Sequence, residues 1–211
     1  MSEGPGPDCP RCPRLVEFRR RCRQAEPQWH NAPVPSFGEI TARLLIVGLA
    51  PGLRGANRTG RPFTGDYAGD LLYATLGKFG LAAGAYAARA DDGLTLIDCR
   101  VTNAVRCVPP ENKPEPKEIA ACNGFLVEEI TAMPRLKAIV ALGAIAHGAV
   151  LTALGKRKSA FPFRHGAIHA LGNGALLADS YHCSRYNTNT GVLTTEMFEA
   201  VFQKIRERLA G

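Results

Sequence analysis

The sequence has no segment that marks export or membrane insertion. Its first residues, MSEGPGPD, carry neither the basic nor the apolar stretch of a signal peptide. Its longest apolar stretch, 138–154, is interrupted by two glycines and His147, so we interpret it as protein core. We therefore expect a cytoplasmic protein with no membrane partner, and we expect residues 1–8 to form a flexible tail.

The sequence also lacks nucleotide-binding fingerprints, and its acidic residues are fewer than its basic ones. The sequence has no P-loop lysine pattern, no dinucleotide fingerprint and no internal repeat. It has 26 Lys and Arg residues against 19 Asp and Glu residues, and the net charge of +7 favours a polyanionic partner, nucleic acid first. The 211 residues, 45% hydrophobic and 21% charged, suit a single globular domain over 1–211, which we expect to be a monomer.

Seven cysteines are present, and in a reducing compartment they favour a metal or a cluster over disulfides. Two residues separate Cys9 from Cys12, and fourteen separate Cys107 from Cys122. Nearby prolines stiffen the backbone, and four thiolates suit zinc or an iron–sulfur cluster, between which the spacing does not choose. The alternative is that some of the four are ordinary buried cysteines, as we expect for the other three.

Apolar runs alternate with helical patterns along the chain. Strands or extended segments are expected at 44–47, 94–97, 101–105, 137–142 and 175–181. Helices are expected at 15–23, 67–79, 117–131, 144–154 and 194–209. This alternation predicts an α/β fold, a three-layer α/β/α sandwich with a short, mainly parallel sheet. In such a fold the ligand lies at the carboxyl ends of the strands.

The stretch 44–69 is the strongest candidate for a ligand site. A strand enters a long glycine-rich loop that carries Phe63, Asp66 and three arginines, and a helix follows. Its prolines and glycines fix one backbone path, and the loop is too long to be only a connector. The alternative is an ordinary connection with surface arginines. A second basic group, Arg19, Arg20, Arg21 and Arg23, is expected on the solvent face of the first helix.

Several segments together resemble a known family. The segments GLAPGLRGANRTGRPFTGD, TNAVRCVPPENKP, ALG after the second long strand, and SYHCSRYNTNTGVLT resemble uracil-DNA glycosylases, closest to the iron–sulfur branch called family 5 or type b. The resemblance spans the chain from Cys9 to the last helix. It implies an α/β/α enzyme that flips uracil, and in some relatives other deaminated bases, out of DNA and hydrolyses the N-glycosidic bond, leaving an abasic site.

The resemblance also implies roles for named residues. It assigns a structural [4Fe–4S] cluster to Cys9, Cys12, Cys107 and Cys122. It places Gly48, Ala50 and Phe63 around the flipped base, with Phe63 stacked on it. It implies that Asn103 pairs with the base edge, that His182 hydrogen-bonds the leaving base, and that Asp66 assists the attack of water.

The chemistry of these side chains suits those roles. The amide of Asn103 offers a donor and an acceptor to a pyrimidine edge. A preorganised donor such as His182 stabilises the negative charge on departing uracil by roughly 3–4 kcal/mol. Asp66 is the only acidic residue between Glu39 and Asp70 and suits the cation-like sugar. The structural alternatives are a turn cap for Asn103, a satisfied buried histidine at 182, and a helix N-cap for Asp66.

Basic loops on the same side are expected to contact DNA. The predicted phosphate contacts are Lys156, Arg157, Lys158 and Arg164. Ser184, Arg185 and Tyr186 stand where a glycosylase inserts a wedge, and we expect Arg185 or Tyr186 to fill the gap left by the base. One competing hypothesis is a non-catalytic nucleic-acid-binding module in which four cysteines hold a structural metal or iron–sulfur centre. Another is covalent trapping of the sugar product by His165 or His169.

Overall fold

Continuous apolar runs form the middle layer of the molecule, because strands covered on both faces bury every side chain. Two such runs become β1 (Leu44–Gly48) and β5 (Ala138–Leu142), in which all residues are buried. The structure, a computed structural model, describes residues 4–172 and 174–210. Its main sheet has five strands, and all neighbouring pairs are parallel except the last. The order is β4 (Cys99–Asn103), β1, β5, β7 (Leu176–Ser180) and β6 (Ile168–Ala170).

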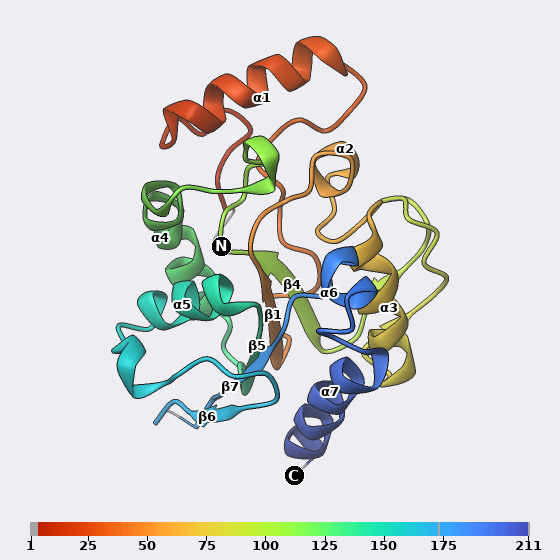
Figure 1. Cartoon of the computed structure of the whole chain (residues 1–211), viewed down its shortest axis with the longest axis vertical. Coiled ribbons are helices and arrows are strands. Elements are labelled where there is room, and N and C mark those ends of the chain that lie inside the picture. Colours follow the sequence, from red (N-terminus) through yellow and green to blue (C-terminus); the bar gives the residue numbers. More distant parts are fainter. Residues whose placement is uncertain (1–3, 173, 211) are drawn as a thin grey trace.

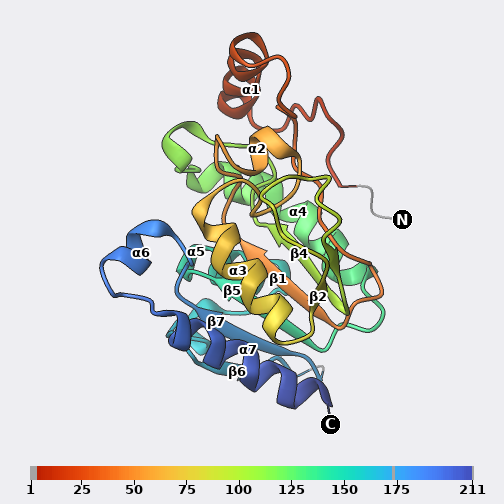
Figure 2. The same cartoon turned by 90° about the vertical axis from the view of Figure 1, so that its right-hand side faces the viewer.

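Four long helices cover the two faces of this sheet and confirm the predicted α/β/α sandwich (Figure 1). The helices α3 (Tyr67–Lys78) and α7 (Thr195–Ala210) pack on one face and lie side by side in Figure 2. The helices α4 (Pro116–Ala132) and α5 (Ala144–Ala153) pack on the other face. Alternate side chains of β1 point into the two cores, as the two-residue period of a strand requires. No helix in the described part of the chain is both long enough and apolar enough to cross a membrane.

Several short elements were not predicted. These are α2 (Ala56–Thr59), β2 (Ala82–Ala83), η1 (Pro110–Asn112), η2 (Lys158–Ala160), β6 and α6 (Arg185–Asn189). β2 pairs in a hairpin with β3 (Thr95–Leu96), which lies within the extended segment predicted at 94–97. Segments of two to five residues are too short to show a helical or strand period in the sequence. β6 exists because its backbone pairs antiparallel with β7, which is a contact between different parts of the chain.

The first helix, α1 (Pro13–Ala25), lies beyond the carboxyl ends of the strands (Figure 1). The prediction that Arg19 lies on its solvent face is wrong, because this residue is only 3% exposed and faces the cysteines. In the expected flexible tail, residues 1–3 lie outside the described residues. Asp8 instead contacts α1, with its Oδ1 2.7 Å from Arg23 Nη1.

A buried ion-pair group ties α4 to the strand that ends at the site. Glu129 of α4 accepts a hydrogen bond from Arg100 of β4 at 2.7 Å and another from Arg106. Arg106 also donates to the Ser36 hydroxyl at 2.6 Å. Burial alone would raise the pKa of Glu129, but Arg106, Ser36 and Arg100 outweigh it and hold that pKa below its ordinary value.

Glu129→Gln is expected to lower the free energy of unfolding by about 3–5 kcal/mol, because the buried guanidinium of Arg106 and the partly buried one of Arg100 lose their counter-charge. Urea unfolding at pH 7 measures this. Since the folded-state pKa of Glu129 is depressed, its contribution is present above its unfolded value near 4.5 and is lost as pH falls below it. Glu17→Gln, which removes only exposed pairs with Arg20 and Arg21, is the control. Equal losses in both variants would contradict the prediction.

Candidate active site

A cavity of about 590 Å³ opens at the carboxyl ends of the parallel strands, where the fold predicts a ligand site. This volume lies within the range of small-molecule pockets. The predicted site residues on its wall are Ala50, Phe63, Asp66, Asn103, His182, Ser184 and Arg185. The loops that follow β1, β4 and β7 therefore converge, as the sequence predicted.

Asp66 caps α3 and also faces the cavity, so its two candidate roles are compatible. Its carboxylate accepts a hydrogen bond from the Gly69 N–H at 3.4 Å. Burial raises the pKa of the carboxyl group, and the amides of Gly69 and Ala68 oppose this in part. A Cβ at position 55 would lie 2.2 Å from Asp66 Oδ2, so only Gly55 leaves room for this carboxylate.

Phe63 is 5% exposed and presents its ring to the cavity. Its φ of 52° is in the left-handed region, which is unusual for a residue with a bulky side chain. The end of β1 is close behind it, because a Cβ at position 48 would lie 2.4 Å from Phe63 Cζ and 2.4 Å from Asn103 Oδ1. Gly48 thus lies behind these two side chains and not on the cavity wall, which Ala50 does form.

Asn103, the last residue of β4, is 3% exposed at the cavity. Its Oδ1 is buried and accepts no hydrogen bond from the described residues. An unpaired buried carbonyl is unfavourable, and it is explained when a ligand supplies the missing donor. Asn103 does not cap a turn through Oδ1, because this oxygen accepts no hydrogen bond from any backbone N–H of the described residues.

His182 follows β7 and completes the opposite wall of the cavity. Its ring stacks near that of Phe63, with 6.0 Å between centroids and 28° between planes. Burial lowers the pKa of His182, so the ring is neutral at pH 7. The hydrogen bonds found among the described residues involve only its backbone carbonyl, which accepts from Asn187 Nδ2 at 2.8 Å. The ring is therefore available to a ligand and is not a satisfied core histidine.

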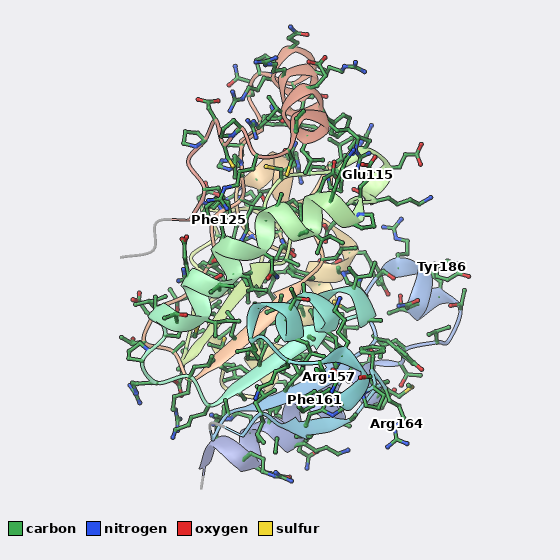
Figure 3. The ribbon with its side chains drawn as sticks, turned by 90° about the vertical axis from the view of Figure 1, so that its left-hand side faces the viewer. Glu115, Phe125, Arg157, Phe161, Arg164 and Tyr186 are labelled. Carbon is green, nitrogen blue, oxygen red and sulfur yellow. The ribbon has the colours of Figure 1, made fainter. Side chains whose placement is uncertain are left out.

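The short helix α6 places two candidate wedge residues differently. Ser184 caps it by accepting from the Asn187 N–H at 3.3 Å. Arg185 borders the cavity with its guanidinium 5.4 Å from the centre of the Tyr67 ring. Tyr186 is 74% exposed and projects from the molecule (Figure 3). Both predicted wedge candidates are exposed, but of the two only Arg185 has a ring contact among the described residues and borders the cavity.

The basic loop before β6, residues 155–166, is held against β7 by hydrogen bonds to the buried carboxylate of Asp179. Asp179 Oδ1 lies 2.6 Å from His147 Nδ1, and its Oδ2 lies 3.0 Å from His169 Nε2 and 3.2 Å from the Arg164 amide. His147 Nε2 also lies 2.8 Å from the Phe161 carbonyl. These are hydrogen-bonding distances, so we interpret the group as a network that fixes the loop.

The exposed basic side chains of this loop are Arg157, Lys158 and Arg164. Arg164 lies on the same side of the molecule as Tyr186 (Figure 3). Lys156 departs from the prediction that it faces DNA beside the active site. Its Nζ lies near Gly172, 4.0 Å from where a Cβ would be, in the turn between β6 and β7. That turn precedes β7 whereas His182 follows it, so the two lie at opposite ends of this strand.

His165 and His169, the candidates for covalent trapping, do not line the cavity. The Nδ1 of His165 accepts a hydrogen bond from the Tyr181 N–H at 3.1 Å, and its ring stacks on Tyr181. His169 bonds to Asp179. Both therefore hold the loop to β7, and the geometry offers no support for product trapping by either.

The three arginines of the glycine-rich loop separate into different roles. Arg54 borders the cavity, and Arg58 Nε donates to the Arg54 carbonyl at 2.8 Å. Arg61 is 5% exposed and supports the loop from within. The cavity wall also includes Tyr67 and Asn112, which sequence reasoning missed. Neither carried a sequence signal, since one was assigned to a helix and the other to a proline-rich loop.

The four predicted cluster ligands line one small pocket between α1 and α4. Arg19 Nη1 donates to Cys107 Sγ at 3.4 Å, and the Arg106 amide donates to Cys122 Sγ at 3.4 Å. The Nε of Arg19 has no partner among the described residues. A buried guanidinium that contacts sulfur and has no carboxylate bound to it suits an anionic thiolate centre.

The spacing of these sulfurs bears on the kind of centre. Thiolates on one tetrahedral zinc ion at 2.3 Å would lie about 3.8 Å apart. In the described part of the chain, the only set of three or more potential ligand atoms within 4.8 Å of one another belongs to His147, His169 and Asp179. No three of the four thiols therefore lie within 4.8 Å of one another.

Comparisons with known proteins agree with this geometry. The family model described as the Uracil DNA glycosylase superfamily matches residues 35–206. The chain is 49% identical over 209 residues to the type-5 uracil-DNA glycosylase of Thermus thermophilus, covering 96% of this chain and 94% of that protein. It is 42% identical over 212 residues to the Mycobacterium tuberculosis protein of the same name (96% and 78% covered), and 41% identical over 201 residues to that of Pyrobaculum aerophilum (93% and 87%). The resemblance found in the motifs is confirmed, and the chain belongs to the uracil DNA glycosylase superfamily.

Proposed function

We propose that this protein removes uracil from DNA by flipping the nucleotide into the cavity and hydrolysing its N-glycosidic bond. The observation that carries the proposal is the convergence of Phe63, Asp66, Asn103 and His182 on one cavity. They come from the segments that end or follow three strands, and the oxygen of Asn103 and the ring of His182 have no hydrogen-bond partner among the described residues. The names of the relatives agree with this activity.

The base is held by stacking and by its edge. The anomeric carbon is out of reach inside a duplex, so the nucleotide must leave the stack at a cost of a few kcal/mol. The Phe63 ring offers a stacking surface that offsets part of this cost. The unpaired Oδ1 of Asn103 accepts from N3–H of uracil, while its amide nitrogen donates to a ring carbonyl.

Neutral His182 assists the departure of the base. As the glycosidic bond breaks, its electron pair stays with uracil, and the negative charge spreads onto the carbonyl oxygens. A neutral ring N–H that donates a hydrogen bond to one of these oxygens stabilises this charge, and His182 keeps its proton. Burial excludes competing water, which strengthens this hydrogen bond.

Asp66 acts on both the sugar and the attacking water. Its carboxylate stabilises the cation-like sugar and accepts a proton from the attacking water, whose oxygen bonds to the anomeric carbon. Because burial raises the pKa of Asp66, its carboxylate is a stronger base than that of an exposed aspartate.

Asp66→Asn is expected to lower the single-turnover rate of uracil release from a uracil-containing oligonucleotide by about 10²–10⁴-fold, because the general base is lost. Asp70→Asn, one helical turn later and exposed, is the matched control and should keep the parental rate. The parental rate should fall at acid pH, with its midpoint above the ordinary aspartate value of 3.8. Binding of the DNA without any base release by the parental protein would instead favour a non-catalytic module.

We further propose that Tyr186 is the wedge that fills the gap left by the flipped base. Tyr186→Ala is then expected to slow uracil release from a duplex about tenfold, since an inserted side chain offsets the cost of unstacking. Release from a single strand, where no gap is formed, should change little. Tyr186→Phe keeps the ring and should keep both rates. Equal losses on both substrates would contradict the wedge role.

We propose also that Cys9, Cys12, Cys107 and Cys122 hold a [4Fe–4S] cluster that braces α1, α4 and the loop after β4. The shared pocket of the thiols and the partly unpaired Arg19 guanidinium support this proposal. When bound, the cluster supplies a structural crosslink rather than a reacting group.

Protein purified without oxygen is expected to contain about four irons per chain and to absorb near ~400 nm. Cys107→Ala should lose both the iron and the absorption, since one ligand is removed. Cys99→Ala changes a buried thiol that donates to a backbone carbonyl in the core and should keep both. A colourless protein that carries one zinc would contradict the cluster.

A further inference from the structure

A segment outside the cavity holds the loop that carries Phe63. Residues 84–94, between the two strands of the small hairpin, pack against residues 61–65 beside α3 (Figure 1). No motif in the sequence analysis involved this segment. Its contacts with the loop are polar, and the Arg61–Asp92 ion pair among them is buried, which is unusual for a surface connection.

The main contact is a two-pronged ion pair. Arg61 Nη1 and Nη2 donate to the two oxygens of Asp92 at 2.8 and 2.7 Å, and Arg61 Nε donates to the Thr64 hydroxyl at 2.8 Å. The Asp92 carboxylate also accepts from the amides of Ala87 and Leu94 at 2.9 and 3.0 Å. The Asp92 side chain is fully buried, and Arg61 holds its pKa well below the ordinary value.

Three aromatic rings enclose the Arg61 guanidinium. The Arg61 Cζ lies 5.1 Å from the ring centre of Phe37, 5.5 Å from that of Tyr73 and 5.8 Å from that of Tyr86. These distances allow cation–π attraction, which is strongest where water is excluded. The charge is therefore fixed in one place by both its partner and its surroundings.

Two of these rings, those of Tyr73 and Tyr86, also hold the backbone on both sides of Phe63. Tyr73 Oη donates to the Pro62 carbonyl at 2.5 Å, and Tyr86 Oη donates to the Phe63 carbonyl at 3.2 Å. Tyr86 Oη also accepts from the Gly65 amide at 3.3 Å. Phe63 has a left-handed backbone, which persists only where the surroundings over-determine it.

We propose that Asp92 and Tyr86 are positioning residues, which act through the backbone at Phe63 to set the efficiency of base removal. Neither lines the cavity. The kinetic part of this inference rests on the proposed function. Its structural part, that these two residues fix the conformation of residues 62–66, does not.

The test uses a mild variant, a stronger one and a control from the same segment. Tyr86→Phe removes a single hydroxyl and leaves the ring packing intact. Asp92→Asn removes the charge that pairs with Arg61. Asp91→Asn changes the neighbouring aspartate, whose pair with Arg89 is exposed, and serves as the control.

In single-turnover release of uracil, we expect about a tenfold lower rate for Tyr86→Phe and a larger loss for Asp92→Asn. Affinity for DNA that contains a tetrahydrofuran analogue of the abasic site should stay within about twofold of the parental value, because no base is stacked there. Asp91→Asn should match the parent in both assays. Parental rates in both variants, or equal losses of rate and of abasic-site affinity, would overturn the proposal.

Hydrogen exchange provides a readout that does not depend on catalysis. Amides at 63–66 should exchange faster in Tyr86→Phe and Asp92→Asn, while those of β1 and β5 keep parental protection. This result can be obtained even if the parental protein releases no uracil, so failure of the proposed function and failure of this inference are distinguishable. Uniform acceleration across the sheet, or no change at 63–66, would show that the two residues do not position the loop.

Discussion

The backbone path between β1 and α3 is the constraint on which the site depends. It brings Phe63 and Asp66 to the end of the sheet through approaches that leave no space for a side chain at Gly48 or Gly55. A methyl group at either position would meet Asn103, Phe63 or Asp66 at less than 2.5 Å. The glycines therefore serve close packing between functional side chains, and the positive φ at Phe63 is the strain that this packing imposes.

Buried charge is used in this molecule to fix loops rather than to increase stability. Glu129 joins α4 to β4, Asp179 joins the basic loop to β7, and Asp92 joins the hairpin segment to Arg61. Buried ion pairs contribute little net stability when compared with apolar residues of similar size, since desolvation opposes attraction. Each of the three, however, has a geometry that only one loop arrangement satisfies. Two of them, Glu129 and Asp92, hold the loops after β4 and β1 that line the candidate site, and both do so from outside the cavity.

Much of the fold followed from periodicity. The long helices and the buried strands were predicted within two residues of their observed bounds, because their apolar patterns are long enough to show a period. The same reasoning predicted that the loops after β1, β4 and β7 converge. It could not find β6, α2 or α6, whose few residues carry no period. It also misplaced Arg19, since a long basic side chain on a helix usually points to solvent, and only the nearby thiols explain its burial.

The sequence alone determined the class of the fold, the motifs of the family and the identities of the residues at the end of the sheet. These are local properties, set by patterns of neighbouring residues and by residue chemistry. The tertiary structure decided which polar groups remain unpaired, and so which face a ligand. Asn103 and His182 face the cavity with unpaired groups, whereas Lys156, His165 and His169 turn to other contacts. It also revealed the contacts of Asp92 with Arg61 and of Tyr86 with Phe63. These partners are 31 and 23 residues apart in the sequence, so no local pattern encodes the contacts.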